Sequence, residues 1–256
     1  MKMSEPILRA KTTDGYSMKV LIDLLQCNIK TGNFKISKEG ITLCMIDSQK
    51  KILIDFNLPA ENFQLFKYTP KNDICVGINL LHLHKMLKSI KKKDSIELFM
   101  PDTKLHLGVK VMPRDSNRTT TSHINTQLMQ NLDITLPSGY GKSHLVSTSE
   151  YQKMCKDMNS IGTEVQITSS ENYIKFNCCD NNVYKREVCF GDEDDGNVEY
   201  MEVYDTDQLY RIIKLSGMST NMNMYAKPKL PLLIKSRVGL LGNIQLYIKN
   251  KSQINN

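Results

Sequence analysis

The sequence predicts an α+β protein made of two similar halves, each with two helices and several antiparallel strands. One order of elements occurs twice: residues 18–53 are typical of an amphipathic helix, a turn and two strands, and residues 151–176 repeat that order. A helix followed by a strand also occurs twice, at residues 78–100 and at residues 205–225. The copies start about 130 residues apart, and repetition of this kind predicts an internal pseudo-twofold relationship.

The predicted strands are identified by a two-residue alternation of apolar and polar side chains, or by β-branched and aromatic residues. In the repeated unit such strands meet at the turns 38–40 and 169–172, and Gly162 ends the helix that precedes the second pair. Further turns are expected at residues 101–102 and 192–196. The remaining expected strands are 52–56, 96–99, 105–111, 183–190 and 246–248.

The composition limits the classes of protein to which the chain can belong. Its 256 residues are 40% hydrophobic and carry a net charge of +7, which permits an anionic partner. No apolar run approaches the roughly 20 residues that a membrane-spanning helix needs, and the N-terminal residues lack the apolar core of a secretory signal. The seven cysteines include no C-x-x-C pair, which favours a reducing, intracellular compartment over a disulfide framework.

Basic side chains recur at one phase of the predicted helices, opposite the apolar face. Leu83 and Leu87 help to define that apolar face in the second helix, as Tyr151 and Met158 do in the third. The cations opposite these faces are Lys19, Lys85, Lys88, Lys153, Lys156, Arg211 and Lys214. The first helix fits only in part, because Ile22 occupies its second basic position.

These cations allow two interpretations. A solvated helix face normally mixes both signs of charge, whereas no acid occupies the repeated positions, although Asp23, Asp157 and Asp207 lie nearby. If the four helices lie side by side, their cations form one basic stripe that suits a phosphate backbone and ignores base sequence. Because few aromatic residues lie among the cations, we expect double-stranded rather than single-stranded DNA.

A polar segment separates the two halves. Residues 114–130 are rich in Ser, Thr and Asn and have no helical period, which is typical of a long connector. An apolar patch follows at residues 132–137, and such a patch is either packed on its own domain or available to a partner. The chain is therefore expected to comprise an N-terminal domain at 1–116, an interdomain connector at 117–137 and a C-terminal domain at 138–256.

Five short segments, spread in order along almost the whole chain, carry a family resemblance. They are Gly40–Leu43 with Ile46-Asp47-Ser48, Val76–Leu80 with the helix around Lys85–Lys88, Lys156–Gly162, Tyr204-Asp205, and Leu230-Pro231-Leu232. Together they resemble the sliding clamps of the proliferating cell nuclear antigen type. The resemblance implies the DNA clamp fold, with two pseudo-symmetric domains that each carry two helices on the inner face and antiparallel sheets outside. It also implies a non-enzymatic polymerase processivity factor, in which three identical subunits close head to tail around duplex DNA.

The resemblance assigns roles to particular residues. The helix cations would face the DNA inside the ring, and strand pairing between His106–Arg114 and Tyr173–Asp180 of neighbouring subunits would close it. A clamp loader would open the ring, and DNA polymerase and other replication proteins would insert a short peptide into an apolar pocket beneath the connector. The pocket residues implied are Ile46, Leu53, Ile134, Leu136, Pro231, Tyr247 and Ile248. Taken singly, Ile46, Leu53 and Ile248 are equally well explained as ordinary core.

Other features depart from the resemblance or leave alternatives open. Lys249 stands where the family usually has a small residue, so the pocket rim is expected to favour a more acidic peptide. The chain is basic where such clamps are usually acidic, and its many Lys, Asn and Ile residues suggest an AT-rich genome, such as that of a large DNA virus or an unusual protist. We therefore expect action in the nucleus or in a cytoplasmic viral replication compartment. Two alternatives are a clamp-fold subunit of a heterotrimeric checkpoint or transcription-associated complex, and a monomeric processivity factor with an open basic face.

Enzymatic interpretations have weaker support. Residues 139–143 resemble the end of a phosphate-binding P-loop, but Leu136 stands where its first glycine is required, and a strand pattern follows in place of a helix. His82 and His84 are expected on different faces of a helix, and the acidic residues 192–195 are typical of a solvated loop. We expect no catalytic residue, no metal and no cofactor.

Overall fold

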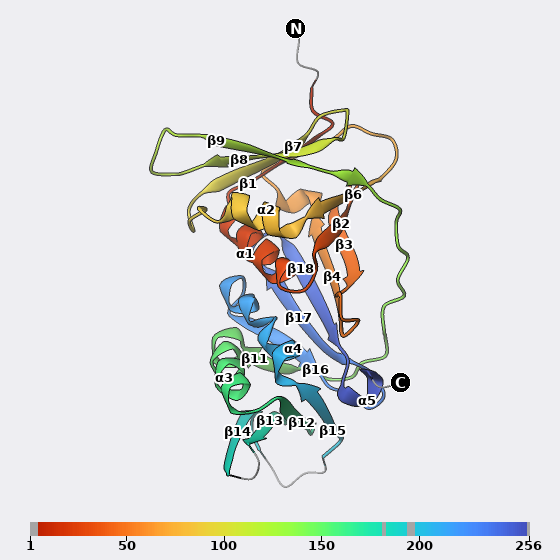
Figure 1. Cartoon of the computed structure of the whole chain (residues 1–256), viewed down its shortest axis with the longest axis vertical. Helices are drawn as coiled ribbons and strands as arrows, with labels where there is room; N and C mark the ends of the chain where they lie inside the picture. The colour runs from red at the N-terminus through yellow and green to blue at the C-terminus, as the bar shows by residue number, and fades with distance from the viewer. Residues whose placement is uncertain (1–4, 181–182, 194–197, 255–256) are drawn as a thin grey trace. The chain divides into compact units, whose positions relative to one another are not determined.

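The computed structural model describes residues 5–180, 183–193 and 198–254 (Figure 1). The chain forms two compact units, each assembled from segments that are separate in the sequence. Unit 1 contains Met1–Met45, Asp55–Ile134 and Arg237–Ile244, and unit 2 contains Ile46–Ile54, Thr135–Ser236 and Gln245–Asn256. In the described ranges, no helix is long and apolar enough to cross a membrane.

Unit 1 contains a five-stranded antiparallel sheet with the strand order β5-β1-β7-β8-β9, and a second group in which β10, β6, β2 and β3 are neighbours in that order. The register of the first sheet places the buried residues Leu98 and Val109 opposite each other. The strands of the first sheet are β1 (Leu8–Thr12), β5 (Leu65–Tyr68), β7 (Ser95–Met100), β8 (His106–Met112) and β9 (Thr120–Asn125). Those of the second group are β2 (Thr31–Ile36), β3 (Gly40–Ile46), β6 (Ile74–Asn79) and β10 (Gln127–Leu128).

Two helices, α1 (Gly15–Gln26) and α2 (Leu80–Leu87), pack against each other in unit 1 (Figure 1). Asp14 caps α1 by accepting a hydrogen bond from the backbone N–H of Ser17, and Asn79 caps α2 in the same way through His82. The apolar face predicted for α1 is buried. Ile22 is only 1% exposed, which explains why no charge stands at this position of the helix.

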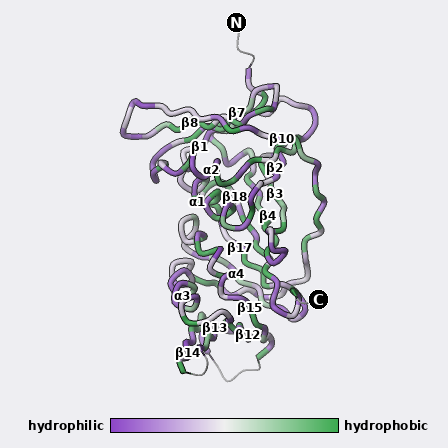
Figure 2. The backbone as a smooth tube through the Cα atoms, viewed as in Figure 1, coloured by the Kyte–Doolittle hydropathy of each residue, from purple (hydrophilic) through white to green (hydrophobic). Residues whose placement is uncertain are grey.

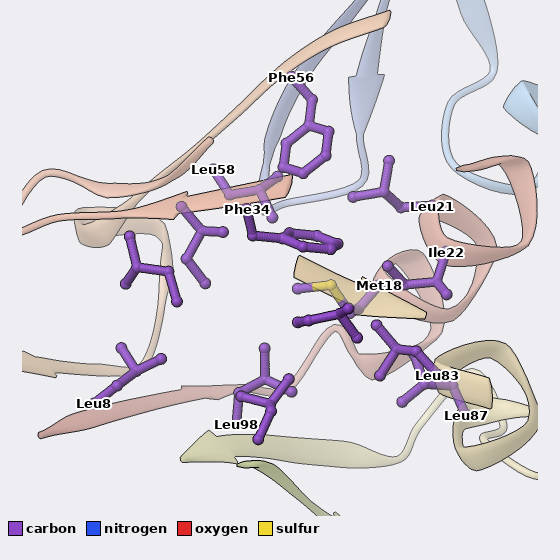
Figure 3. Close-up of a pocket in the computed structure, with 14 residues that line it drawn as sticks. Leu8, Met18, Leu21, Ile22, Phe34, Phe56, Leu58, Leu83, Leu87 and Leu98 are labelled. Atoms are coloured by element: carbon purple, nitrogen blue, oxygen red, sulfur yellow. The ribbon is translucent and has the colours of Figure 1, made fainter. Parts of the chain in front are cut away.

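The hydrophobic core of unit 1 lies where these helices meet the strands. In Figure 3, Met18 and Leu21 of α1 and Leu83 of α2 converge on the aromatic rings of Phe34 and Phe56. A gap of about 30 Å³ remains among the apolar side chains that line this region. Because an apolar gap of this size offers water no hydrogen-bond partner, we regard it as imperfect core packing and not as a ligand site.

Unit 2 contains a four-stranded antiparallel sheet with the order β14-β13-β12-β15, and a second group in which β17, β16 and β11 are neighbours. The register of the first sheet places the buried residues Ile167 and Phe176 opposite each other. Its strands are β12 (Glu164–Ser169), β13 (Tyr173–Asp180), β14 (Tyr184–Gly191) and β15 (Tyr200–Asp205). The other strands are β11 (His144–Ser147), β16 (Asn221–Tyr225), β17 (Leu232–Val238), β18 (Gly242–Ile248) and β4 (Ile52–Pro59), and the last three contain residues of both units.

The main helix of unit 2 is α3 (Thr148–Ile161), which begins three residues before the predicted start at residue 151 and has the end and the buried face that the sequence predicts. Ser147 caps its N-terminus through the backbone N–H of Glu150, and Gly162 follows its last residue. A Cβ at Gly162 would lie 3.0 Å from the backbone oxygen of Cys179, so the helix ends in close contact with β13. The predicted inward residues Tyr151, Met154, Cys155 and Met158 are all buried.

The helix expected after residue 205 is shorter than the sequence pattern suggested. The α-helix α4 (Thr206–Tyr210) ends after five residues, and a 3₁₀ helix, η2 (Ile213–Gly217), follows. Between them Ile212 has φ −105° and ψ 4°, outside the α-helical region. The two adjacent β-branched residues Ile212 and Ile213 favour an α-helix less than unbranched residues do. In the 3₁₀ arrangement that follows α4, both side chains are buried.

The predicted α+β class with two similar halves is confirmed. In unit 1, α1 is followed by β2 and β3, and α2 is followed by β7. In unit 2, α3 is followed by β12 and β13, and α4 with η2 is followed by β16. A short α5 (Lys251–Ile254) and a 3₁₀ helix, η1 (Ala60–Asn62), stand outside this repeat.

The strands expected to close a ring are not the outer strands of their sheets. β8 lies between β7 and β9, and β13 lies between β12 and β14, so the outer strands next to them are β9 and β14; β5 and β15 are the outer strands at the opposite ends of the two sheets. The sequence interpretation missed β9 because Ile124 is its only buried residue, which gives the strand the polar composition of a connector. The loop between β8 and β9 is also hydrophilic (Figure 2), and its polar sequence supported the interpretation of this segment as a connector. The segment expected as connector therefore contributes β9 and β10 to the sheets of unit 1.

Candidate functional site

The helices of unit 1 carry three of the predicted DNA-contacting cations. Lys85, in the last turn of α2, and Lys88, which follows that helix, are exposed. Lys19 on α1 is half-buried, and its Nζ donates a hydrogen bond to the backbone oxygen of Ile90 at 2.9 Å. The structure therefore brings Lys19 to the C-terminal end of α2, near the two exposed lysines. Cations at this end of a helix are also favoured by the helix dipole.

Two further predicted cations lie on α3 of unit 2. Lys153 and Lys156 are both exposed. The Nζ of Lys153 lies 2.8 Å from Oε1 of Glu150, and this hydrogen bond raises the pKa of Lys153 above its ordinary value. An ion pair this exposed contributes little to stability and leaves the ammonium group accessible to an anion.

Arg211 and Lys214, at the end of α4 and in η2, are half-buried. The guanidinium group of Arg211 forms an ion pair with Asp207, donates a hydrogen bond to Oε1 of Gln49 at 2.9 Å, and lies 3.6 Å from Oδ2 of Asp47. Two carboxylates therefore neutralise much of the Arg211 charge. Among the seven predicted cations, Lys85, Lys88, Lys153 and Lys156 are the ones whose charge is exposed.

Asp47 organises the turn between β3 and β4. Its side chain is completely buried and accepts hydrogen bonds from the backbone N–H groups of Gln49 (3.3 Å), Lys51 (2.7 Å) and Ile52 (2.8 Å). A carboxylate that satisfies several backbone donors is a typical means of holding a tight turn. Since Ile46 directly precedes Asp47, the same contacts also position a residue of the predicted peptide pocket.

Three tyrosines of unit 2, Tyr140, Tyr225 and Tyr247, form a cluster that includes one predicted pocket residue. The hydroxyl group of Tyr140 donates a hydrogen bond to the backbone oxygen of Pro231 at 2.8 Å. The centre of its ring lies 6.1 Å from that of Tyr225 and 6.3 Å from that of Tyr247. Burial raises the pKa of Tyr140 well above its ordinary value, so the hydroxyl group stays protonated and remains a donor. Pro231 and Tyr247, both predicted pocket residues, are thus brought together.

The predicted pocket residues on β3, β4 and β18 differ in exposure. Ile46 is 46% exposed and Leu53 is half-buried. A hydrogen bond of 2.9 Å from the backbone N–H of Lys249 to the oxygen of Lys51 places the turn beside the end of β18. Ile248 is completely buried, so its side chain packs beneath the surface and not on it.

The connector contributes two half-buried apolar residues, Ile134 and Leu136. Ile134 is the last connector residue of unit 1, and Leu136 belongs to unit 2. At its start the connector is held to unit 1 by the pairing of β10 with β6 and by a hydrogen bond of 2.8 Å from the Asn33 side chain to the backbone oxygen of Gln130. The apolar residues Ile134 and Leu136 therefore follow the part of the connector that these contacts hold.

Tyr140 contacts two of the predicted pocket residues, and the sequence interpretation did not include it. The segment around it was considered only as a P-loop, and the strand β11 does follow it as expected. An aromatic residue between two glycines, directly after an apolar patch, was the signal available in the sequence. Part of the acidic segment expected as a solvated loop, Asp194 and Asp195, lies outside the described residues, whereas Glu193 forms an ion pair with Lys175.

Two named relatives match almost the whole length of the chain. One relative, named "Probable DNA polymerase sliding clamp 1" from Paramecium bursaria Chlorella virus 1, is 22% identical over 254 residues, which cover 94% of this chain and 96% of the relative. The proliferating cell nuclear antigen of Chaetomium thermophilum is 20% identical, with 96% of this chain and 98% of the relative covered.

The fold has a close counterpart among solved structures. The crystal structure of proliferating cellular nuclear antigen from Entamoeba histolytica superposes with a TM-score of 0.84 at 18% identity, and the match covers 96% of this chain and 99% of that one. The clamp fold inferred from the sequence resemblance is thereby confirmed. The family model described as "Proliferating cell nuclear antigen, N-terminal domain" matches residues 7–135, just over half of the chain. The chain therefore belongs to the proliferating cell nuclear antigen family.

Proposed function

We propose that the protein is a DNA sliding clamp that encircles duplex DNA as a homotrimeric ring and tethers DNA polymerase and other replication or repair proteins. The observation that carries this proposal is the clamp fold over nearly the whole chain, with helices in both units that carry exposed lysines. Such a clamp acts by encirclement and needs no catalytic residue, metal or cofactor. It would work in the nucleus or in a cytoplasmic viral replication compartment, where DNA is copied.

The ring would close through the outer strands β9 and β14. A strand at the end of a sheet carries unpaired backbone groups, and pairing with a neighbouring subunit satisfies them. A contact between two different edges is heterologous and therefore generates a ring when the rotation closes. On this proposal the domains expected at 1–116 and 138–256 alternate around the ring, and β9, which lies within the range 117–137 expected as connector, belongs to the first of them.

The DNA surface would consist of the seven helix cations, with unequal contributions. The exposed residues Lys85, Lys88, Lys153 and Lys156 would contact phosphates most directly. Arg211 would contribute less, because Asp47 and Asp207 already neutralise its charge. Contacts of this kind depend on phosphate charge and not on bases, as sliding along any sequence requires.

Partner proteins would dock a short peptide on the surface formed by Ile46, Leu53, Leu136, Pro231 and the tyrosine cluster, together with Ile134. Hydrophobic anchors of a peptide turn would replace water against the exposed side chain of Ile46 and the half-buried side chains of Leu53, Leu136 and Pro231. The exposed Lys249 would favour a peptide with acidic residues beside its anchors. DNA polymerase and the clamp loader are the partners we expect at this surface.

Encirclement is tested by retention on a linear duplex whose ends are blocked after the protein has bound. A closed ring is expected to resist a high-salt wash and to leave the DNA when a restriction enzyme cuts it between the blocks. Loss of the protein in the high-salt wash itself would instead support the monomeric alternative, in which electrostatic attraction alone holds the DNA. A protein that forms no stable homotrimer would support the heterotrimeric alternative.

A further inference from the structure

A loop of unit 1 outside the proposed DNA surface carries three consecutive lysines. It comprises Lys91, Lys92, Lys93 and Asp94 and connects α2 to β7. All three lysines are exposed, whereas Asp94 is only 6% exposed. The loop therefore presents three positive charges to solvent while its one acid is turned inward.

Asp94 gives the loop a defined shape. Its Oδ2 accepts a hydrogen bond from the backbone N–H of Lys91 at 2.9 Å, and its own N–H donates to the oxygen of Lys91 at 3.1 Å. Gly15 lets this turn approach α1 closely, because a Cβ at Gly15 would lie 2.7 Å from the backbone oxygen of Asp94. The three lysines consequently project from a turn that is packed against the start of α1.

Tyr16 connects the loop to the cations of the helices. The Nζ atoms of Lys19 and Lys92 lie 5.7 Å and 5.9 Å from the centre of the Tyr16 ring, within the range of a cation–π interaction. Lys19 also donates its hydrogen bond to Ile90, which directly precedes the loop. The loop lysines thus continue the basic surface of α1 and α2.

We propose that Lys91, Lys92 and Lys93 bind the phosphate backbone of duplex DNA and extend the contact made by the helices of unit 1. The proposal rests on the function proposed above. A lysine contacts phosphate as a flexible point charge and reads no bases, which suits a protein that moves along DNA. Duplex is favoured over a single strand because Lys19 and Lys92 already lie over the ring of Tyr16, an aromatic residue beside the loop that could otherwise stack on an unpaired base.

The salt dependence of binding tests this contact. Binding to a labelled duplex of about 30 base pairs is measured by fluorescence anisotropy between about 50 and 200 mM salt for the wild type and for K91Q/K92Q/K93Q. The slope of log affinity against log salt is expected to become shallower by up to about 2.7 per bound chain, because each phosphate contact contributes about 0.9. The control K38Q/K67Q/K71Q removes three other exposed lysines of unit 1 and is expected to keep the wild-type slope.

The outcomes separate this inference from the proposed function. If the wild type binds and the loop variant keeps its slope, the loop contact is wrong and the clamp function stands. If the wild type fails to bind duplex DNA at all, both are wrong. Acylation of lysines with and without the duplex, read by mass spectrometry, gives a second measurement: DNA is expected to protect Lys91–Lys93. If protection of these lysines from acylation increases with protein concentration and does not depend on DNA, the loop contacts an acidic protein surface, and the proposal is overturned.

Discussion

The guanidinium group of Arg211 lies 3.6 Å from the carboxylate of Asp47, whose side chain is completely buried. Asp47 also accepts three backbone hydrogen bonds in the turn that follows Ile46. One carboxylate therefore links the end of α4 to the turn beside the proposed peptide surface. This explains why a residue expected to face DNA is half-buried and engaged by acids.

Replacing Asp47 with Asn should destabilise the protein by about 2 to 4 kcal/mol, because the amide offers one acceptor oxygen in place of two and lacks the charge that pairs with half-buried Arg211. Urea unfolding measures the change in the free energy of unfolding. The matched control is Asp207→Asn, which removes the exposed partner of Arg211 and should cost less than about 1 kcal/mol. Equal losses for the two variants would contradict the structural role of Asp47.

The double variant I134A/L136A should weaken binding of a hydrophobic clamp-binding peptide at least about tenfold, because each truncation removes apolar contact area. Anisotropy of a labelled peptide gives the affinity, and light scattering shows whether assembly is unchanged. Leu145→Ala, at an apolar residue that is 67% exposed on β11, serves as the control. Unchanged affinity in the double variant would show that the connector does not form the peptide site.

Tyr140→Phe should lower peptide affinity by less than the connector variant. The change removes the hydrogen bond to Pro231, which is worth about 1 kcal/mol, and keeps the ring against Tyr225 and Tyr247. Tyr140→Ala should lower it further, since the ring contacts are lost as well. If both variants bind the peptide as the wild type does, Tyr140 lies outside the site.

Charge reversal at Lys85 and Lys156 should weaken DNA retention and leave assembly intact. Both side chains are exposed on helices, and neither residue belongs to β9 or β14, the strands proposed to close the ring. The assay with blocked DNA ends measures retention, and light scattering measures assembly. K67E/K229E makes the same charge change at one exposed lysine of each unit and should retain DNA normally. Disassembly caused by K85E/K156E would place these residues at a subunit contact.

Cysteine alkylation at pH 8 should follow the burial of each thiol. Burial raises the pKa of Cys155 to about 12, so its reactive thiolate form is scarce, whereas Cys27 and Cys179 are exposed. Iodoacetamide labelling read by mass spectrometry should modify Cys27 and Cys179 first and Cys155 only after unfolding. Early modification of Cys155 would show that α3 does not bury it.

The sequence predicted features that depend on local order. The buried face of α3 follows from the three- and four-residue spacing of Tyr151, Met154 and Met158, and its end follows from Gly162. The repeated order of elements indicated two similar halves. The ion pair of Arg211 with Asp207, four residues apart, has helical spacing, but the sequence analysis did not predict it.

Features that depend on distant contacts could not be predicted in this way. Tyr140 contacts Tyr225, Pro231 and Tyr247, which lie far from it in the sequence, so its place between two glycines could not identify these partners. The sequence did not reveal β9 as an outer strand, because a strand with one buried residue has the composition of a loop. The engagement of Arg211 by Asp47 likewise required the fold, since the two residues belong to separate segments of unit 2.

The native mass of the purified protein, measured by light scattering across a dilution series, tests the central claim most directly. A self-closing ring predicts a particle near three times 29.3 kDa that persists on dilution. A monomer at every concentration would contradict the homotrimeric ring.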